Sequence, residues 1–206
     1  FRSVDGLYNQ QYDYPPETIL SHTFFMRNTP EFYRFYRNKM IFPDAEPNKA
    51  HLALAELEKQ GKLKAVITQN IDGLHQKAGS NEVLELHGSV LRNYCMKCGK
   101  FYNLHDTISQ EGVPKCSCGG IIKPDVVLYE EGLDSQTING AVRAISKADM
   151  LIIGGTSLVV YPAAGMIDYF KGKYLAVLNR DATSRDKQAD LCITDPIGEV
   201  LGRIRV

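Results

Sequence analysis

Three short runs of apolar and β-branched residues constrain the fold most strongly. They cover residues 65–68, 150–153 and 174–178, and none contains a charge. Such runs are typical of strands buried on both faces of a parallel sheet. Helical sequence precedes the first two, one helix being expected between an N-cap at Asn48 and a stop at Gly61, the other over 138–148. The sequence therefore predicts an α/β fold with a parallel, doubly wound sheet.

A polar cluster follows the first predicted strand at once. It contains Gln69, Asn70, Asp72 and His75. In open α/β sheets, ligands bind at the carboxyl ends of strands, and burying such polar groups is costly unless they bond to one another or to a ligand. A helix cap formed by Asn70 or Asp72 explains the same residues. From this cluster alone, a binding site and a simple cap are equally good interpretations.

Small and polar residues also end the other two predicted strands. Two adjacent glycines let a phosphate or ribose approach the backbone, the next two residues carry hydroxyls, and a polar residue after the third strand can accept a hydrogen bond from a ribose. Each cluster alone is explained by an ordinary turn. Polar ends on three neighbouring strands favour a nucleotide site. The residues concerned are Gly154, Gly155, Thr156, Ser157, Asn179 and Asp181.

Four of the five cysteines form two close pairs, Cys95 with Cys98 and Cys116 with Cys118. Paired thiolates at this spacing favour a tetrahedral Zn²⁺ site over disulfides. Because the protein fills all four positions, the metal is expected to be structural rather than catalytic. Cys192 stands apart in apolar sequence and is expected to be a buried, inert thiol.

Composition excludes some classes of protein. The chain has 24 Lys and Arg against 24 Asp and Glu, which disfavours a protein whose main role is to bind nucleic acid through its phosphates. It has neither a membrane-spanning apolar run nor a secretory segment, so a cytoplasmic protein is expected. The sequence opens on Phe1 rather than Met, so the start of the gene product is expected to be missing.

The stretch from residue 17 to residue 40 is helical in pattern and dense in aromatic residues. Thr29, Pro30 and Glu31 indicate a fresh helix start. A small helical module with its own aromatic core is favoured over a substrate-binding aromatic box.

Taken together, these features resemble the sirtuins, the NAD-dependent protein lysine deacylases. The resemblance covers the whole chain and depends on several motifs in the same order. It implies a Rossmann-like large domain, a small domain, and a cleft between them where NAD and an acyl-lysine peptide meet. The motifs lie at 68–75, 84–88, the four cysteines, 123–127, 155–164 and Asn179.

The resemblance also implies domain boundaries. The Rossmann-like NAD-binding domain is expected to be discontinuous, at 1–16, 48–93 and 125–206. The small domain is expected to combine a helical module at 17–47 with a zinc-binding module at 94–124.

The implied activity is NAD-dependent deacetylation of acetyl-lysine in proteins or peptides. The acyl oxygen attacks the ribose carbon as nicotinamide leaves, and the acyl group ends on ADP-ribose. His87 is implied as the general base that activates a ribose hydroxyl, a role that suits an imidazole. Asn70 is implied to position ribose or water.

The resemblance assigns binding roles to further residues. The peptide is expected to pair with the chain as an added strand, at Val127, Leu128, Tyr129 and Val160. Contacts with NAD are expected from Phe1, Arg2, Gln69, Asn70, Asp72, Gly155, Thr156, Ser157, Asn179, Asp181 and Ile197.

Three departures from the family pattern stand out. The glycine-rich pyrophosphate loop would precede Phe1, so a polypeptide that truly starts at Phe1 is expected to bind NAD poorly. The usual Phe-Gly-Glu is Tyr129, Glu130 and Glu131 here, which leaves the lysine channel open to question. The Tyr-x-x-Arg of desuccinylating members is replaced by a motif that ends in Tyr36, so acetyl and other uncharged acyl groups are expected substrates.

Two other functions fit part of this pattern. One is a protein ADP-ribosyltransferase that uses the same NAD cleft. The other is a noncatalytic zinc protein that binds ADP-ribose or nucleic acid. The pairing of His87 with Asn70 and the balanced charge favour the deacetylase.

Overall fold

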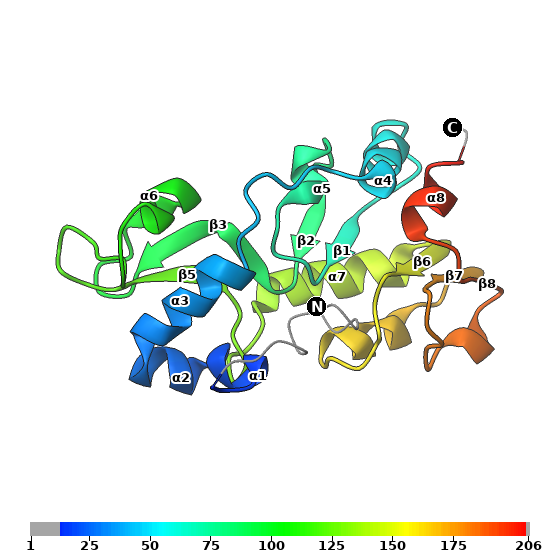
Figure 1. Ribbon diagram of the computed structural model, residues 1–206. Helices are drawn as coiled ribbons and strands as arrows, with labels where there is room; N and C mark the ends of the chain where they lie inside the picture. Colours follow the sequence, from blue (N-terminus) through cyan, green and yellow to red (C-terminus); the bar gives the residue numbers. More distant parts are fainter. Residues whose placement is uncertain (1–12, 205–206) are drawn as a thin grey trace. The chain divides into compact units, whose positions relative to one another are not determined.

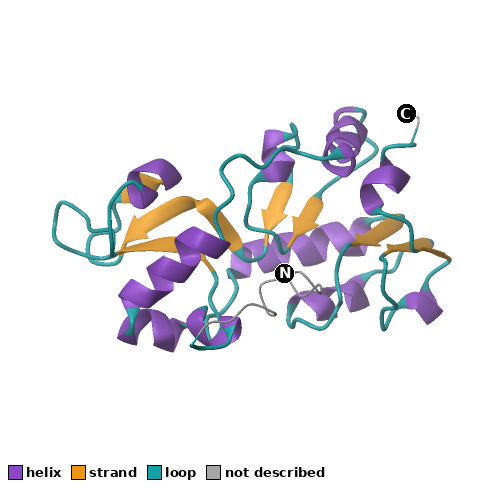
Figure 2. Ribbon diagram, in the orientation of Figure 1, coloured by secondary structure: helices purple, strands orange, loops and turns teal. Residues whose placement is uncertain are grey.

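The computed structural model describes residues 13–204 and divides into two compact units, built from the helices and strands of Figures 1 and 2. The first unit holds the described residues up to Asp44 together with Asn70–Gly73 and His87–Leu133. The second holds Ala45–Gln69, Leu74–Leu86 and the chain from Asp134 onward.

Three helices form one part of the first unit. They are α1 (Pro16–Ile19), α2 (His22–Arg27) and α3 (Thr29–Lys39), and α3 begins where the sequence predicted a helix start. Phe25, Phe32 and other aromatic side chains of these helices are almost fully buried, in one cluster with Val126 of the neighbouring sheet. The interpretation of these aromatics as a structural core is therefore confirmed.

An antiparallel sheet forms the other part of the first unit. Its order is β4 (Phe101–Asn103), β3 (Gly88–Cys95) and β5 (Ile122–Val126), with α6 (Leu104–Ile108) following β4. β3 pairs with β5 at both of its ends, with a shift of register between Ser89 and Asn93.

A glycine is required where β3 begins. Gly88 has a φ of +74°, and a Cβ added there would lie 1.9 Å from the carbonyl oxygen of Asp125. No side chain fits so close to another backbone. Gly88 therefore allows the start of β3 to lie directly against β5.

The second unit contains two parallel sheets. In one, β1 (Val66–Thr68) pairs with β2 (Val83–Glu85); in the other, the order is β6 (Met150–Gly154), β7 (Tyr174–Leu178) and β8 (Leu191–Ile193). The three strands predicted from apolar runs are β1, β6 and β7. The α/β class with parallel strands is therefore confirmed.

Helices surround these parallel strands. Asn48 caps α4, its side-chain oxygen accepting hydrogen bonds from the backbone N–H groups of Ala50 (2.9 Å) and His51 (3.2 Å), as predicted. The helical segments of this unit are α4 (Lys49–Lys59), α5 (Leu74–Lys77), α7 (Ser135–Lys147), η2 (Ala163–Tyr169), η3 (Asp186–Gln188) and α8 (Ile197–Leu201).

One prediction about the second unit is wrong. Cys192 was expected to be buried, but it is exposed. In the described part of the chain, β8 pairs only with β7 and leaves the Leu191 and Cys192 side chains uncovered. An apolar neighbourhood in the sequence did not reveal this edge position. Within residues 13–204, no helix has the length and apolar character needed to cross a membrane.

Candidate active site and metal centre

The four predicted zinc ligands lie together in the first unit. The Sγ atoms of Cys95 and Cys118 are 3.5 Å apart, those of Cys98 and Cys116 are 3.6 Å apart, and all four lie within 4.8 Å of one another. A zinc–sulfur distance of about 2.3 Å in a tetrahedron requires sulfur atoms about 3.8 Å apart, whereas a disulfide requires about 2.05 Å. The group therefore fits a structural zinc ion.

Backbone N–H groups around the cysteines favour the thiolate form that zinc requires. The N–H of Cys118 donates to Cys116 Sγ (3.5 Å), and the N–H of Lys97 donates to Cys95 Sγ (3.4 Å). The N–H of Cys118 and then the Tyr102 hydroxyl lower the pKa of Cys116 to about 5. The sequence did not predict the role of Tyr102, which reaches the cluster from β4.

The predicted nucleotide residues gather at the carboxyl ends of β6, β7 and β8 in the second unit. The N–H of Gly155 donates to the carbonyl of Leu178 (3.1 Å), and the N–H of Asn179 donates to the carbonyl of Ile193 (3.0 Å). These bonds continue the parallel register beyond the strands. The ends of β6, β7 and β8 therefore lie side by side, whereas β1, the other strand with a predicted polar end, pairs with β2 in a separate sheet.

Gly155 leaves open space beside these strand ends. Its φ is +61°, and a Cβ added there would have no heavy atom within 4 Å. Gly154 differs, since a Cβ there would lie 2.4 Å from the side chain of Ile197. An exposed backbone with room above it suits a phosphate or ribose. These residues therefore fit the phosphate or ribose of NAD.

Hydrogen bonds order the polar groups at this edge. Asn179 Nδ2 donates to the carbonyl of Asp181 (2.8 Å), and Thr156 Oγ1 accepts from the N–H of Leu158 (3.3 Å). Val160 is half-buried and its carbonyl accepts from the N–H of Ala164 (3.0 Å). The structure thus brings together Gly155, Thr156, Ser157, Asn179, Asp181 and Ile197. Phe1 and Arg2 lie outside the described residues.

The residues predicted for catalysis lie on two neighbouring stretches of chain. In the second unit, the N–H of Leu86 donates to the carbonyl of Thr68 (2.9 Å), and Gln69 follows Thr68 there. In the first unit, the N–H of Val90 donates to the carbonyl of Ile71 (3.0 Å). The stretch that holds Asn70 and Asp72 therefore lies beside the stretch that begins with His87.

The predicted substrate segment adjoins His87. The N–H of Val127 donates to the carbonyl of His87 (3.0 Å). Leu128 is buried in the aromatic core, whereas Tyr129 is partly exposed. Tyr129 also forms a parallel bridge with Ser21, its N–H donating to Leu20 and its carbonyl accepting from His22, both at 2.9 Å. Its N–H is therefore already used within the unit.

Comparison with known proteins identifies the family. The Sir2 family matches residues 1–162. The chain belongs to the Sir2 family. An NAD-dependent protein deacetylase of Clostridium acetobutylicum is 62% identical over 98% of this chain and 84% of the relative. Another, of Clostridium perfringens, is 60% identical over 99% of this chain and 85% of the relative.

Solved Sir2 structures share the fold. A complex described as Sir2, p53 peptide and NAD⁺ is 40% identical, with a TM-score of 0.86, and the match covers 94% of this chain and 83% of that one. A Sir2 complex with an inhibitor, 2′-O-acetyl-ADP-ribose and a deacetylated p53 peptide is 41% identical, with a TM-score of 0.84, over 90% and 83% of the two chains.

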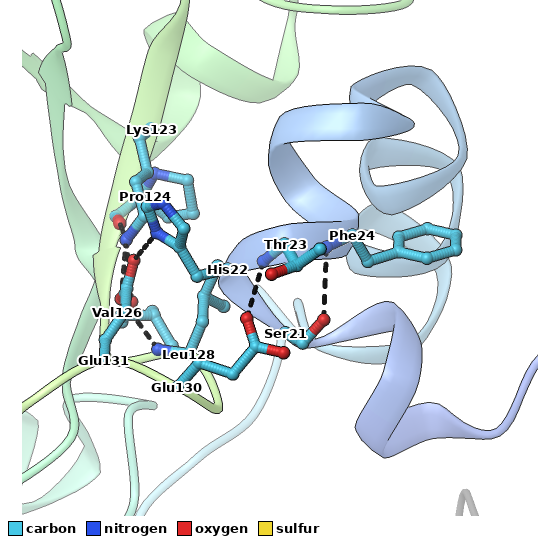
Figure 3. Close-up of polar contacts among 10 residues, drawn as sticks. All are labelled: Ser21, His22, Thr23, Phe24, Lys123, Pro124, Val126, Leu128, Glu130 and Glu131. Atoms are coloured by element: carbon cyan, nitrogen blue, oxygen red, sulfur yellow. Dashed lines mark hydrogen bonds and ion pairs between the residues drawn. The ribbon is translucent and has the colours of Figure 1, made fainter.

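In this Sir2 family member, a polar cluster that the sequence did not predict borders the substrate segment (Figure 3). Glu131 accepts hydrogen bonds from His22 Nδ1 (2.9 Å), Lys123 Nζ (3.1 Å) and the N–H of Leu128 (2.9 Å). The departure from the family's Phe-Gly-Glu at residues 129–131 was the one sequence feature that pointed to this cluster.

The glutamates of this cluster should make the Sir2 family member sensitive to acid. Hydrogen bonds from Thr23 lower the pKa of Glu130. Partial burial raises the pKa of Glu131, but the Leu128 N–H, His22 and Lys123 outweigh it and lower that pKa. Lowered pKa values contribute stability above the ordinary value of about 4.3, and this stability is lost as pH falls through the folded values.

We therefore expect the free energy of unfolding to decrease between about pH 5 and pH 3, where such carboxylates protonate. Urea unfolding across this range measures it. Glu131→Gln should be less stable than wild type at pH 6, and its free energy of unfolding should fall less steeply with acid. Parallel curves for the two proteins would contradict the assignment.

Proposed function

We propose that this chain is an NAD-dependent protein lysine deacetylase, which transfers the acetyl group of acetyl-lysine to ADP-ribose and releases nicotinamide. One observation carries the proposal. The hydrogen bond from Val127 to the carbonyl of His87 (3.0 Å) joins the candidate peptide segment to the candidate base. Relatives at 60% and 62% identity, named NAD-dependent protein deacetylases, support it.

His87 is the general base. Its imidazole accepts the proton of a ribose hydroxyl, which then takes up the acyl group, and a side chain that titrates near neutral pH suits this step. Asn70, on the adjoining stretch, orients the ribose or a water molecule. When bound, NAD supplies the ribose carbon that loses nicotinamide and the hydroxyls that receive the acyl group.

Other residues hold the two substrates. Gln69 and Asp72 contact the nicotinamide and ribose portion of NAD, together with Phe1 and Arg2. The peptide lies as an added strand along Val127, Leu128, Tyr129 and Val160 and bonds to their carbonyl oxygens, because the N–H groups of residues 127–129 already bond within the unit. This mode reads backbone more than side chains. The phosphates and adenosine are held by Gly155, Thr156, Ser157, Asn179, Asp181 and Ile197.

Zinc has a structural role in this scheme. Four cysteine ligands fill a tetrahedral site and leave no position for water or substrate. We retain the division into a Rossmann-like domain (1–16, 48–93 and 125–206) and a small domain (17–47 and 94–124) as part of the proposal. We also propose a cytoplasmic location, because clustered cysteines that bind metal rather than form disulfides are typical of a reducing compartment, and we expect no direct nucleic-acid partner.

The test is an acetyl-lysine peptide assay with and without NAD. The expected products, identified by mass spectrometry, are the free-lysine peptide, nicotinamide and O-acetyl-ADP-ribose, all dependent on NAD. Labelled NAD in the presence of a protein acceptor is the counter-test. Transfer of ADP-ribose to protein without loss of acetyl groups would identify an ADP-ribosyltransferase and overturn the proposal.

We expect acetyl-lysine to be preferred over succinyl-lysine. Where desuccinylating members carry Arg, this chain carries Tyr36, whose side chain is 1% exposed. An anionic acyl group without a cationic partner would be buried unpaired. We therefore expect kcat/KM for succinyl-lysine to be lower than that for acetyl-lysine by at least about tenfold, which corresponds to a penalty of about 1.4 kcal/mol. A butyryl-lysine peptide, similar in length but uncharged, separates charge from size. Faster turnover of succinyl-lysine would refute the expectation.

A further inference from the structure

The backbone of Glu130 has an unusual conformation directly after the candidate peptide segment. Its φ is +77°, and in the described part of the chain Leu158 is the one other non-glycine residue with a positive φ. Residues with a Cβ rarely adopt this region because of steric strain. The sirtuin pattern has glycine at this position, which carries no such strain. An interaction of the Glu130 side chain must therefore compensate here.

The Glu130 carboxylate makes that interaction with α2. Its Oε2 atom accepts a hydrogen bond from the backbone N–H of Thr23 at 2.8 Å, across 107 residues of sequence (Figure 3). Thr23 lies in the first turn of α2, where N–H groups have no partner within the helix. After the hydrogen bonds from Thr23, the positive charge of Arg27 also lowers the pKa of this carboxylate. Glu130 thus links the chain just after Tyr129 to the first turn of α2.

Two further contacts link residues 129 and 131 to the first turn of α2. The N–H of His22 donates to the carbonyl of Tyr129 (2.9 Å), and His22 Nδ1 contacts Glu131 (2.9 Å). Residues 129–131 are therefore held one after another by residues 20–23. At its other end, the peptide segment is held by the bond from Val127 to His87. The main chain of residues 127–129 is thus held at both ends.

We propose that Glu130 is a positioning residue for the peptide substrate, whose carboxylate, held on α2, keeps the main chain of residues 127–129 in the conformation that receives the acetyl-lysine peptide. This role rests on the proposed function. It follows from the position of Glu130, since a strand can be added only to a backbone whose conformation is set beforehand. A role limited to capping α2 would stabilise the fold without affecting the peptide.

Three variants separate these roles. Glu130→Ala removes the carboxylate, Glu130→Gly also removes the backbone strain, and Glu130→Gln keeps an oxygen that can accept from Thr23. Loss of one cap-type bond, about 1 kcal/mol, corresponds to about fivefold. We expect Glu130→Ala and Glu130→Gly to raise the peptide KM and the peptide dissociation constant by about this factor. Glu130→Gln should restore most of the affinity, and the NAD KM and kcat should stay close to wild type.

Asp134 supplies a matched control. Its Oδ2 atom accepts from the N–H (2.7 Å) and the hydroxyl (2.8 Å) of Thr137 in the first turn of α7, the same kind of contact as that of Glu130. Asp134→Ala should lower Tm without changing the peptide KM or affinity. If Glu130→Ala lowers Tm in the same way and leaves both peptide constants unchanged, the positioning role is overturned.

Direct binding keeps this test distinct from the test of function. Fluorescence anisotropy with a labelled acetyl-lysine peptide measures affinity without turnover. A wild-type protein that binds the peptide but never removes the acetyl group would overturn the proposed function, while the affinities of the Glu130 variants would still decide the positioning role. A wild-type protein that does not bind the peptide overturns both.

Discussion

His87→Ala should reduce kcat of NAD-dependent deacetylation by about 10² to 10⁴-fold, the usual contribution of a general base. The reason is local. Alanine removes the imidazole but keeps the carbonyl that accepts the hydrogen bond from Val127. The peptide segment should therefore stay in place, with Tm and peptide affinity close to those of wild type. Steady-state kinetics measures kcat, and calorimetry measures Tm and peptide affinity.

A second histidine provides the control for this substitution. His105 lies in α6, and its side chain is 87% exposed. His105→Ala should retain full activity, which excludes a general effect of histidine loss. If His87→Ala retained the activity of wild type, the assignment of the base would be wrong. If it also left ADP-ribose binding as the one measurable property, a noncatalytic binding protein would explain the chain better.

The parallel strands were predictable because strands that are buried on both faces appear in the sequence as short runs of apolar and β-branched residues. The runs at β1, β6 and β7 contain no charge, and their polar ends follow immediately. β2 and β8 are three residues long and carry no comparable pattern, so neither was predicted. The antiparallel pairing of β3 with β5 was also missed, because it depends on contacts between distant segments and on a glycine at residue 88.

The residues of the site also divide into those that the sequence could predict and those that depend on contacts between distant segments. The four cysteines were predictable because zinc ligands recur at short spacings. His87 came from the resemblance to a family, since the residues alone had drawn attention to the cluster after β1. The contacts of Glu130 with Thr23 and of Glu131 with His22 join segments more than 100 residues apart. No periodicity or spacing in a single sequence encodes such a pairing.

Removal of zinc should have the second large effect. Structural zinc contributes about 10–16 kcal/mol of apparent binding free energy in small zinc-dependent folds. β3 ends at Cys95 and pairs there with Ile122, and the same two strands pair Gly88 with Val126 at their other ends. Disorder at the cysteines should therefore spread along the sheet to the residues beside His87. We expect a strong chelator to lower Tm sharply and to abolish deacetylation.

Metal analysis, thermal unfolding and activity should be measured on one protein sample. One zinc ion per chain is expected, and Cys116→Ser should lose both the metal and the activity, because Cys116 is a buried ligand with no substitute. Cys192→Ser is the control, since that thiol is exposed and lies outside the cluster. It should keep the metal and the wild-type Tm. An active, zinc-free protein with an unchanged Tm would show that the cysteine cluster is dispensable, because β3 and β5 would then hold the residues beside His87 without it.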